Sequence, residues 1–335
     1  MNSGSRRVIV TQRFFDDESI GFLEAAGCEV VVAELPPGQA DGRLSHEELV
    51  TLLEGAEGWI VGHARVTREL LGALPRLSIV SRRGVGHERV DLQAARDLGR
   101  VVTIAAGGND ASVADQVIGM MIGVGRRFRE AQNQMMGGSW SILMGTDLYR
   151  KTVGVVGLGR IGRSVVQRLS GFEARMLVAT SGPDLDYAAA TGVTFVDVPT
   201  LLRESDYVTL HAPLTPESRH MINTESLKTM RPGAFVINTA RGGLVSDADL
   251  LAALQAGRLG GAGLDVFESE SDPTMQPVTD ALIALPNVIA APHAGASTRE
   301  GLARTNMIAS RCVVDVFEGR DPPEACVVAD GRRAA

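Results

Sequence analysis

A glycine-rich turn between a short apolar run and an amphipathic segment constrains this chain most strongly. Residues 153–162 read Val-Gly-Val-Val-Gly-Leu-Gly-Arg-Ile-Gly. The valines predict a buried strand, and apolar residues continue at near-helical spacing at Ile161, Val165, Val166 and Leu169. In such a unit Gly157 permits the tight turn, Gly159 lets the backbone approach a pyrophosphate, and Gly162 lets helix and strand pack closely. The stretch predicts a dinucleotide-binding βα unit rather than a plain strand–helix turn.

Length and composition indicate a globular protein of about two domains. The chain has 335 residues, 44% of them hydrophobic, and a formal net charge of −7. That charge argues against general affinity for nucleic acid or an anionic membrane. Cys28, Cys312 and Cys326 have no metal-site spacing, so we expect reduced thiols, no metal and a cytoplasmic location. We also expect no secretory signal and no bilayer-spanning segment.

The order of strand-like and helix-like runs predicts two α/β series. The first series occupies residues 8–105 and includes a capping box at Ser45-His-Glu-Glu48 and a break at Pro36-Pro37-Gly38. One long helix, Val113–Met136, is expected to cross between domains. The second series begins at Val153 with strand-like runs at 153–156, 176–179, 194–196, 207–210, 234–237, 263–266 and 288–290. This alternation predicts parallel sheets with helices on both faces.

The C-terminal part predicts a return of the chain to the first domain. Thr298–Glu318 reads as one more long helix after the last strand-like run of the second series. Such a return makes the first domain discontinuous. The polar segment after it, residues 326–335, is expected to be a frayed tail.

Four polar residues follow strand-like runs of the second series, where a doubly wound sheet presents its ligands. Arg241 can hold a carboxylate through two parallel hydrogen bonds. His293 can pass a proton to or from a carbonyl oxygen, and a carboxylate beside it, from Asp265 or Glu270, can orient it. Each residue alone also fits a structural role. Together they suit reduction of a 2-oxo acid by a bound nicotinamide.

These segments resemble the D-isomer-specific 2-hydroxyacid dehydrogenases, and among them the phosphoglycerate dehydrogenase branch. The resemblance runs from about Leu74 to about Gly319 and rests on these stretches: Ser81-Arg-Arg-Gly-Val-Gly86, Ser112-Val-Ala-Asp115, the Gly157 turn, His211-Ala-Pro-Leu-Thr-Pro216, Asn238-Thr-Ala-Arg-Gly-Gly243, Asp265-Val-Phe-Glu-Ser-Glu270 and Pro292-His293. It implies a Rossmann-type doubly wound cofactor domain, residues 109–298, inserted into a discontinuous flavodoxin-like substrate domain, residues 1–108 and 299–325. It also implies a homodimer. We expect no C-terminal regulatory domain.

The resemblance assigns roles to residues. It implies Arg241, Glu270 and His293 as the catalytic set and NAD(H) or NADP(H) as cofactor. The cofactor-binding candidates are Gly157, Gly159, Arg160, Ile161, Gly162, Thr180, Ala212, Pro213, Thr239, Ala240, Asp265 and Gly295. The substrate-binding candidates are Arg82, Arg83, Val85, Gly86 and Arg241. The implied reaction transfers hydride between the nicotinamide and C2 of a small D-2-hydroxy acid or 2-oxo acid, with His293 as the proton donor.

Three positions depart from the family pattern. Thr180 stands where an aspartate usually binds the ribose hydroxyls, which permits NADP(H) and leaves NAD(H) open. Ser271 follows Glu270 where proline is usual. The pair Arg82–Arg83 suggests a substrate with a second anionic group, a phosphate or phosphonate, against the alternative of a solvent-exposed pair.

Other functions remain as alternatives. A nicotinamide-sensing corepressor-like binding protein of the same superfamily keeps the same arginine, glutamate and histidine. Formate oxidation on this fold is disfavoured by Glu270, whereas no residue excludes phosphite oxidation. Turnover of any 2-oxo acid would separate the enzyme from the binding protein.

Overall fold

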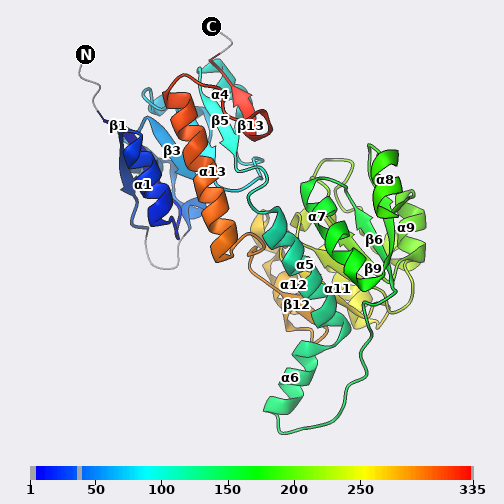
Figure 1. Cartoon of the computed structure of the whole chain (residues 1–335). Coiled ribbons are helices and arrows are strands. Elements are labelled where there is room, and N and C mark those ends of the chain that lie inside the picture. Colours follow the sequence, from blue (N-terminus) through cyan, green and yellow to red (C-terminus); the bar gives the residue numbers. More distant parts are fainter. Residues whose placement is uncertain (1–4, 36–39, 333–335) are drawn as a thin grey trace. The chain divides into compact units, whose positions relative to one another are not determined.

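A computed structural model describes residues 5–35 and 40–332, and it divides into two compact units (Figure 1). Unit 1 combines the chain up to Asn109 with the segment from Ala296 onward, and unit 2 is Asp110–Gly295. The break expected at Pro36–Gly38 lies outside the described residues.

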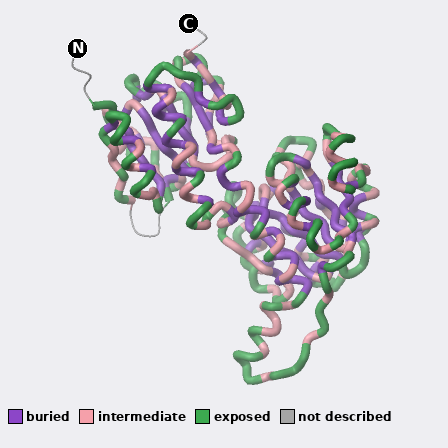
Figure 2. The backbone as a smooth tube through the Cα atoms, viewed as in Figure 1, coloured by how far each residue is buried: buried purple, intermediate pink, exposed green. Residues whose placement is uncertain are grey.

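Among the described residues, unit 1 is built on a six-stranded sheet with the order β13-β5-β4-β3-β1-β2. The first five strands in the chain are parallel, and β13 is antiparallel to β5. Figure 2 shows the central strands of this sheet as buried. The strands are β1 (Arg6–Val10), β2 (Cys28–Val32), β3 (Gly58–Val61), β4 (Ile79–Arg82), β5 (Val101–Ile104) and β13 (Val327–Asp330).

Helices cover both faces of this sheet and start at side-chain caps. Ser45 and Glu48 form the predicted capping box, in which the Glu48 carboxylate accepts the Ser45 N–H at 2.7 Å. The returning helix is capped by Thr298, and its Ala309 and Val313 pack on Val8 and Ile79. The helices are α1 (Asp17–Ala25), α2 (His46–Leu52), α3 (Arg68–Ala73), α4 (Leu92–Asp97) and α13 (Arg299–Phe317), with the 3₁₀ turns η1 (Asp41–Arg43) and η6 (Glu324–Cys326).

The expectation of a frayed tail from residue 326 is wrong for most of that segment. Val327–Asp330 form β13, which pairs with β5 and buries Ala329 in the core. Cys326 is buried beside Cys312, although 13 residues of helix end, loop and turn separate them in the chain. Its apolar run, Cys326–Ala329, is too short to indicate a strand by itself, and the strand forms because it pairs with β5. Residues 333–335 lie outside the described part of the chain.

Unit 2, which the structure describes throughout, is built on a seven-stranded parallel sheet with the order β12-β11-β10-β9-β6-β7-β8. The strand order reverses between β6 and β9, which is the switch point of a doubly wound sheet. Two apolar clusters fill its faces. The strands are β6 (Thr152–Val156), β7 (Arg175–Ala179), β8 (Thr194–Phe195), β9 (Tyr207–Leu210), β10 (Phe235–Asn238), β11 (Gly261–Leu264) and β12 (Val288–Ala290).

Helices lie on both sides of this sheet (Figure 1). The largest helix-to-helix packing joins α5 and α7. The helices are α5 (Asp110–Gly125), α6 (Phe128–Met136), α7 (Arg160–Leu169), α8 (Leu185–Thr191), α9 (Val198–Glu204), α10 (Thr224–Thr229), α11 (Asp247–Gln255) and α12 (Gln276–Ala284). Short 3₁₀ turns follow α7 at η2 (Ser170–Phe172), β10 at η3 (Gly242–Leu244) and β11 at η4 (Glu268–Glu270), and a further one, η5 (Pro273–Met275), precedes α12.

The single long helix predicted for Val113–Met136 is wrong, because the structure has two helices there. The first, α5, buries one side and ends at Gly125, where a Cβ would lie 2.2 Å from the Tyr207 hydroxyl. Arg127 then takes a left-handed φ of +57°, which ends one helix and redirects the next. Figure 1 shows α6 and the chain after it projecting from the rest of unit 2, and we call residues 128–147 the arm.

In the part of the chain that the structure describes, no helix combines the length and apolarity needed to cross a membrane.

Candidate active site

The glycine turn after β6 has the geometry of a pyrophosphate cradle. Gly157 has a φ of +94°, and a Cβ there would stand 2.6 Å from the carbonyl oxygen of His211. A Cβ on Gly162 would lie 2.2 Å from the Gly157 carbonyl oxygen. At Gly159, in contrast, no heavy atom of the described residues lies within 4 Å of that position. The start of α7 therefore has room for a pyrophosphate, which the N–H groups of a helix N-terminus favour.

The other candidate cofactor residues of the sequence follow neighbouring strands of the same sheet. Because these strands are parallel, their carboxyl ends meet at one edge. Arg160 and Ile161 begin α7; Thr180 follows β7, Ala212 and Pro213 follow β9, Thr239 and Ala240 follow β10, Asp265 follows β11, and Gly295 follows β12. The edge thus carries the whole candidate cofactor set.

His211 lies directly behind the glycine turn. Its backbone N–H donates to the Val156 carbonyl at 2.7 Å, and its Nε2 hydrogen-bonds the Thr209 hydroxyl at 2.9 Å. Burial lowers the pKa of His211 to about 4. The imidazole is therefore neutral near pH 7 and supports the turn without adding charge.

The position expected to bind the ribose hydroxyls of the cofactor carries no carboxylate. Thr180 directly follows β7, and Asp184 is the N-cap of α8. The Asp184 carboxylate pairs with Arg163 at 2.9 Å and accepts the Tyr187 N–H, and these bonds hold its pKa below the usual range. Asp184 therefore has local partners on α7 and α8.

The loop of Arg241 is held by a buried amide. The Asn238 side chain accepts the Ala240 N–H at 3.1 Å and donates to the Arg241 carbonyl at 2.8 Å. Asn238 is 1% exposed. The Arg241 guanidinium donates to the Ala240 carbonyl at 2.7 Å. The loop conformation is thus set by strand β10 and by a side chain that the sequence analysis gave no role.

Glu270 and His293 form a close pair at the same edge. The Nδ1 atom of His293 lies 2.6 Å from a Glu270 carboxylate oxygen, and 38% of each side chain is exposed. The other Glu270 oxygen accepts the Phe267 N–H at 2.9 Å. With Nδ1 held by the carboxylate, Nε2 is the nitrogen that can exchange a proton with a ligand.

Asp265 shapes the loop that carries His293. One carboxylate oxygen accepts the Ala294 N–H at 2.7 Å, the other accepts the Gly295 N–H at 2.8 Å, and the Asp265 carbonyl accepts the His293 N–H at 2.8 Å. His293 takes a left-handed φ of +53°, an uncommon state for a non-glycine residue. Three hydrogen bonds to one buried aspartate hold it there.

A second buried acidic group lies under the same loops, and the sequence analysis missed it. Glu268 and Asp247 each accept the other's backbone N–H, both at 2.9 Å, and the second Glu268 oxygen lies 2.6 Å from Nε2 of His220. Burial and the nearby Glu268 and Glu270 carboxylates raise the pKa of Asp247 to about 7. The sequence feature that could have indicated this group is the presence of two glutamates, one on each side of a serine, in Glu268-Ser-Glu270.

The candidate substrate residues Arg82, Arg83, Val85 and Gly86 lie in unit 1, at the carboxyl end of β4 and just after it. Arg82 is only 5% exposed and donates to the Gly62 carbonyl, so the alternative of a solvent-exposed pair is wrong for it. Arg83 donates to the Arg13 carbonyl at 2.8 Å, and burial lowers its pKa.

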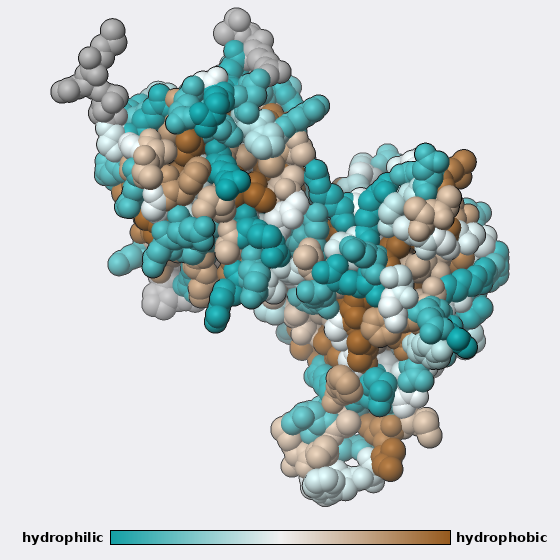
Figure 3. All heavy atoms as spheres, viewed as in Figure 1, coloured by the Kyte–Doolittle hydropathy of each residue, from teal (hydrophilic) through white to brown (hydrophobic). Residues whose placement is uncertain are grey.

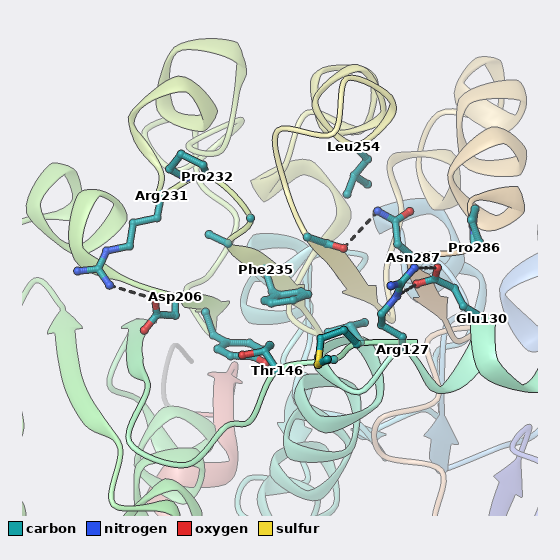
Figure 4. A pocket seen from close by; sticks show the side chains of 18 of the residues that line it. Arg127, Glu130, Thr146, Asp206, Arg231, Pro232, Phe235, Leu254, Pro286 and Asn287 are labelled. Carbon is teal, nitrogen blue, oxygen red and sulfur yellow. Dashed lines mark hydrogen bonds and ion pairs between the residues drawn. The ribbon is translucent and has the colours of Figure 1, made fainter. Parts of the chain in front are cut away.

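A cavity of about 870 Å³ lies at the opposite edge of the unit 2 sheet (Figure 4). Tyr207 and Phe235, which begin β9 and β10, stack in it with ring centroids 4.7 Å apart. Arg127 pairs with Glu130, and Arg231 with Asp206, around its wall. It lies at the amino ends of the strands, away from the candidate catalytic residues.

Comparison with known proteins identifies the family. The model of the NAD binding domain of D-isomer specific 2-hydroxyacid dehydrogenases matches residues 118–295, more than half of the 335 residues. The chain belongs to this family. The predicted resemblance and the Rossmann-type α/β fold class are thereby confirmed, and unit 2 contains the NAD binding domain of a D-2-hydroxyacid dehydrogenase.

Named relatives of this dehydrogenase family differ in substrate. D-3-phosphoglycerate dehydrogenase of Methanocaldococcus jannaschii is 35% identical over 93% of the chain, which spans 58% of that relative's length. Glyoxylate reductase of Thermofilum pendens is 34% identical over 95% of the chain and 94% of the relative. The structure of D-lactate dehydrogenase of Aquifex aeolicus with NAD and lactic acid has a TM-score of 0.81 at 27% identity, covering 96% of this chain and 99% of that one.

Proposed function

We propose that this protein is an NAD(P)-dependent D-2-hydroxyacid dehydrogenase that acts as a 2-oxo acid reductase. The observation that carries the proposal is the 2.6 Å pair of Glu270 and His293, which lies at the same sheet edge as the glycine turn and Arg241. Proteins similar to this chain are named glyoxylate reductase, hydroxypyruvate reductase and D-lactate dehydrogenase.

The residues of the chain have complementary tasks in this proposal. A bound reduced nicotinamide supplies the hydride. Arg241 holds the substrate carboxylate and fixes C2 for attack. Before the transfer, Glu270 stabilises the His293 imidazolium and keeps Nδ1 fixed. His293 then gives the proton of Nε2 to the oxygen that gains negative charge at C2 and becomes a neutral imidazole. In the oxidative direction His293 accepts that proton. The backbone at Val85 and Gly86 is proposed to hold the substrate as well.

We further propose that the cofactor site accepts both NADH and NADPH. Thr180 places no negative charge beside a 2′-phosphate, and the nearest acidic side chain along the chain, Asp184, is paired with Arg163. The proposal predicts turnover with both cofactors. The measurement that checks it is kcat/KM for NADH and for NADPH, determined in parallel.

The decisive experiment measures reduced-cofactor oxidation against a panel of 2-oxo acids with and without a phosphate or phosphonate group. Turnover of glyoxylate or hydroxypyruvate supports a general 2-oxo acid reductase. A strong preference for doubly anionic members supports Arg82 and Arg83 as a second anion site, which Arg83→Gln should then weaken. Tight cofactor binding without any turnover refutes the enzyme and favours the corepressor-like alternative.

We also propose a homodimer in which the arm covers a second copy of this chain. The arm exposes large apolar side chains, including Met136 at 70%, Trp140 at 82% and Ile142 at 93% exposed. Figure 3 shows tan and brown side chains on the projecting arm. An apolar segment of this kind on a projecting element is typical of an association surface.

The test is the molar mass in solution. Ile142→Asp is expected to convert a dimer into a monomer, measured by light scattering after size exclusion. Leu185→Asp is the matched control, because Leu185 is 76% exposed on α8 of the same unit and outside the arm. A wild-type monomer, or equal dissociation by both variants, contradicts the proposal.

A reducing, cytoplasmic location is proposed from the three buried free cysteines.

A further inference from the structure

One short turn of unit 2 carries two histidine–carboxylate pairs. In η4, Glu270 holds Nδ1 of His293, and Glu268 holds Nε2 of His220, both at 2.6 Å. The first pair is exposed at the candidate active site. The second is more enclosed, since only 9% of the Glu268 side chain is exposed. The proposed reaction uses the first pair and gives the second no task.

Glu268 is tied to the start of α11 by two reciprocal hydrogen bonds. Its carboxylate accepts the Asp247 N–H and the Asp247 carboxylate accepts its N–H, both at 2.9 Å. Asp247 is 1% exposed. Because both backbone donors are satisfied by buried carboxylates, η4 is fixed to α11 in one position.

The Arg241 loop lies between the peptide that leads into Glu268 and His220. A Cβ on Gly242 would lie 2.2 Å from the Phe267 carbonyl oxygen, so the residue after Arg241 lies against the peptide that leads into Glu268. On its other side, the Gly243 carbonyl accepts the His220 N–H at 2.8 Å. The His220–Glu268 hydrogen bond therefore joins the segments on either side of this loop.

His220 is held in an uncommon backbone state. Its φ is +51°, a left-handed value that costs free energy for any residue with a Cβ. The Asn223 side chain donates to its carbonyl at 2.9 Å and its imidazole bonds Glu268. Backbone strain at a residue bonded to a buried carboxylate points to a role for that bond.

We propose that Glu268, Asp247 and His220 form a positioning network that holds the Arg241 loop and Glu270 in register for the reaction. This inference rests on the proposed function, because it assigns the network to the same site. None of the three residues touches substrate in it. They act through Arg241, whose loop they enclose, and through Glu270, which lies two residues after Glu268 on the same turn.

The position of the turn depends on the balance of charges around the network. Asp247 faces the Glu268 and Glu270 carboxylates, with His220 as the nearby group that offsets their charge. Removing the His220 bond takes away the group that offsets the Glu268 charge beside Asp247 and Glu270, and the turn is expected to shift. A displacement near 1 Å of a catalytic pair can cost about a hundredfold in rate.

The experiment compares Glu268→Gln and His220→Asn with a matched control. Glutamine keeps an acceptor for the Asp247 N–H but removes the charge that pairs with His220. Asparagine tolerates the left-handed backbone, so it removes the imidazole bond with little added strain. The control is Glu69→Gln, which removes an exposed glutamate that pairs with His46 at 3.8 Å in unit 1.

Glu268→Gln and His220→Asn are each expected to lower kcat for a 2-oxo acid by about tenfold or more, with the Kd of NADH unchanged within twofold. The double variant is expected to lose no more than the larger single variant, because the two residues share one bond. Glu69→Gln is expected to match the wild type. Folded Glu268→Gln and His220→Asn proteins with kcat within twofold of the wild type overturn the network, even when their Tm is lower.

A second measurement separates this failure from failure of the proposed function. The chain has six histidines, whose imidazole NMR signals can be assigned by single variants. The Glu268→Gln change is expected to move the His293 signal at fixed pH, and Glu69→Gln is expected to leave it in place. If the wild type turns over no 2-oxo acid, the function fails; an unmoved His293 signal refutes the network in either case.

Discussion

Asp247 and His211 give unit 2 two opposing dependences of stability on pH. Burial and neighbouring carboxylates raise the pKa of Asp247 from 3.8 to about 7. Burial lowers the pKa of His211 from 6.5 to about 4. Both groups therefore change the stability of the same unit between about pH 4 and pH 7, in opposite directions.

The signs follow from which state binds the proton more tightly. The folded state holds the Asp247 proton more tightly than the unfolded state, so this contribution is full below about pH 4 and is lost as the pH rises through 7. The folded state disfavours protonated His211, so that contribution is full above about pH 6.5 and is lost as the pH falls towards 4. At about 1.36 kcal/mol per unit, Asp247 accounts for roughly 4 kcal/mol and His211 for roughly 3 kcal/mol. In the wild type they nearly cancel.

Single variants should reveal each contribution. Asp247→Asn is expected to lose stability on acidification, relative to the wild type, because only the His211 contribution remains. His211→Gln is expected to gain relative stability over the same range. The assay is urea unfolding at half-unit steps from pH 4.5 to pH 7.5, with Asp186→Asn on the surface of unit 2 as the control for removing a carboxylate. Parallel pH profiles for wild type and Asp247→Asn would refute the assignment of a buried proton to Asp247.

Three further substitutions test the local structure. Gly157→Ala is expected to raise the Kd of NADH at least tenfold and to lower Tm, since its Cβ would meet the His211 carbonyl at a φ of +94°; binding titration and calorimetry measure both, and an unchanged Kd contradicts the cradle. Thr180→Asp is expected to shift the NADH/NADPH ratio of kcat/KM at least tenfold towards NADH, and an unchanged ratio would place the ribose elsewhere. Ser45→Ala is expected to destabilise unit 1 by about 1 kcal/mol in urea unfolding with the Kd of NADH unchanged, because it removes the α2 cap.

Features set by a few neighbouring residues could be predicted from the sequence. The Gly157 turn and the Ser45 capping box depend on local backbone requirements, which residue type alone reveals. The strand positions of the second series follow from short apolar runs that a parallel sheet buries on both faces. The strand and the helix predicted on either side of the glycine turn are both present, as β6 and α7.

Features set by distant partners could not be predicted. Val327–Asp330 become a strand because β5 offers an edge for pairing. Helix α5 ends where Gly125 lies against the Tyr207 hydroxyl and Arg127 takes a left-handed φ. In each case the contacting residue is far away in the sequence. A prediction from periodicity therefore made one helix too long and did not assign the last strand.

The two glutamates of Glu268-Ser-Glu270 show the limit most clearly. In sequence they are equivalent acidic residues after an Asp-Val-Phe step, and only the family resemblance favoured the second as the partner of His293. The 3₁₀ turn separates them: Glu268 is directed to buried Asp247 and His220, and Glu270 to exposed His293. Their division of roles depends on which side of a three-residue turn meets the core. Catalytic and positioning residues alternate along this one turn. Only the folded structure therefore distinguishes the proposed role of Glu270 from that of Glu268.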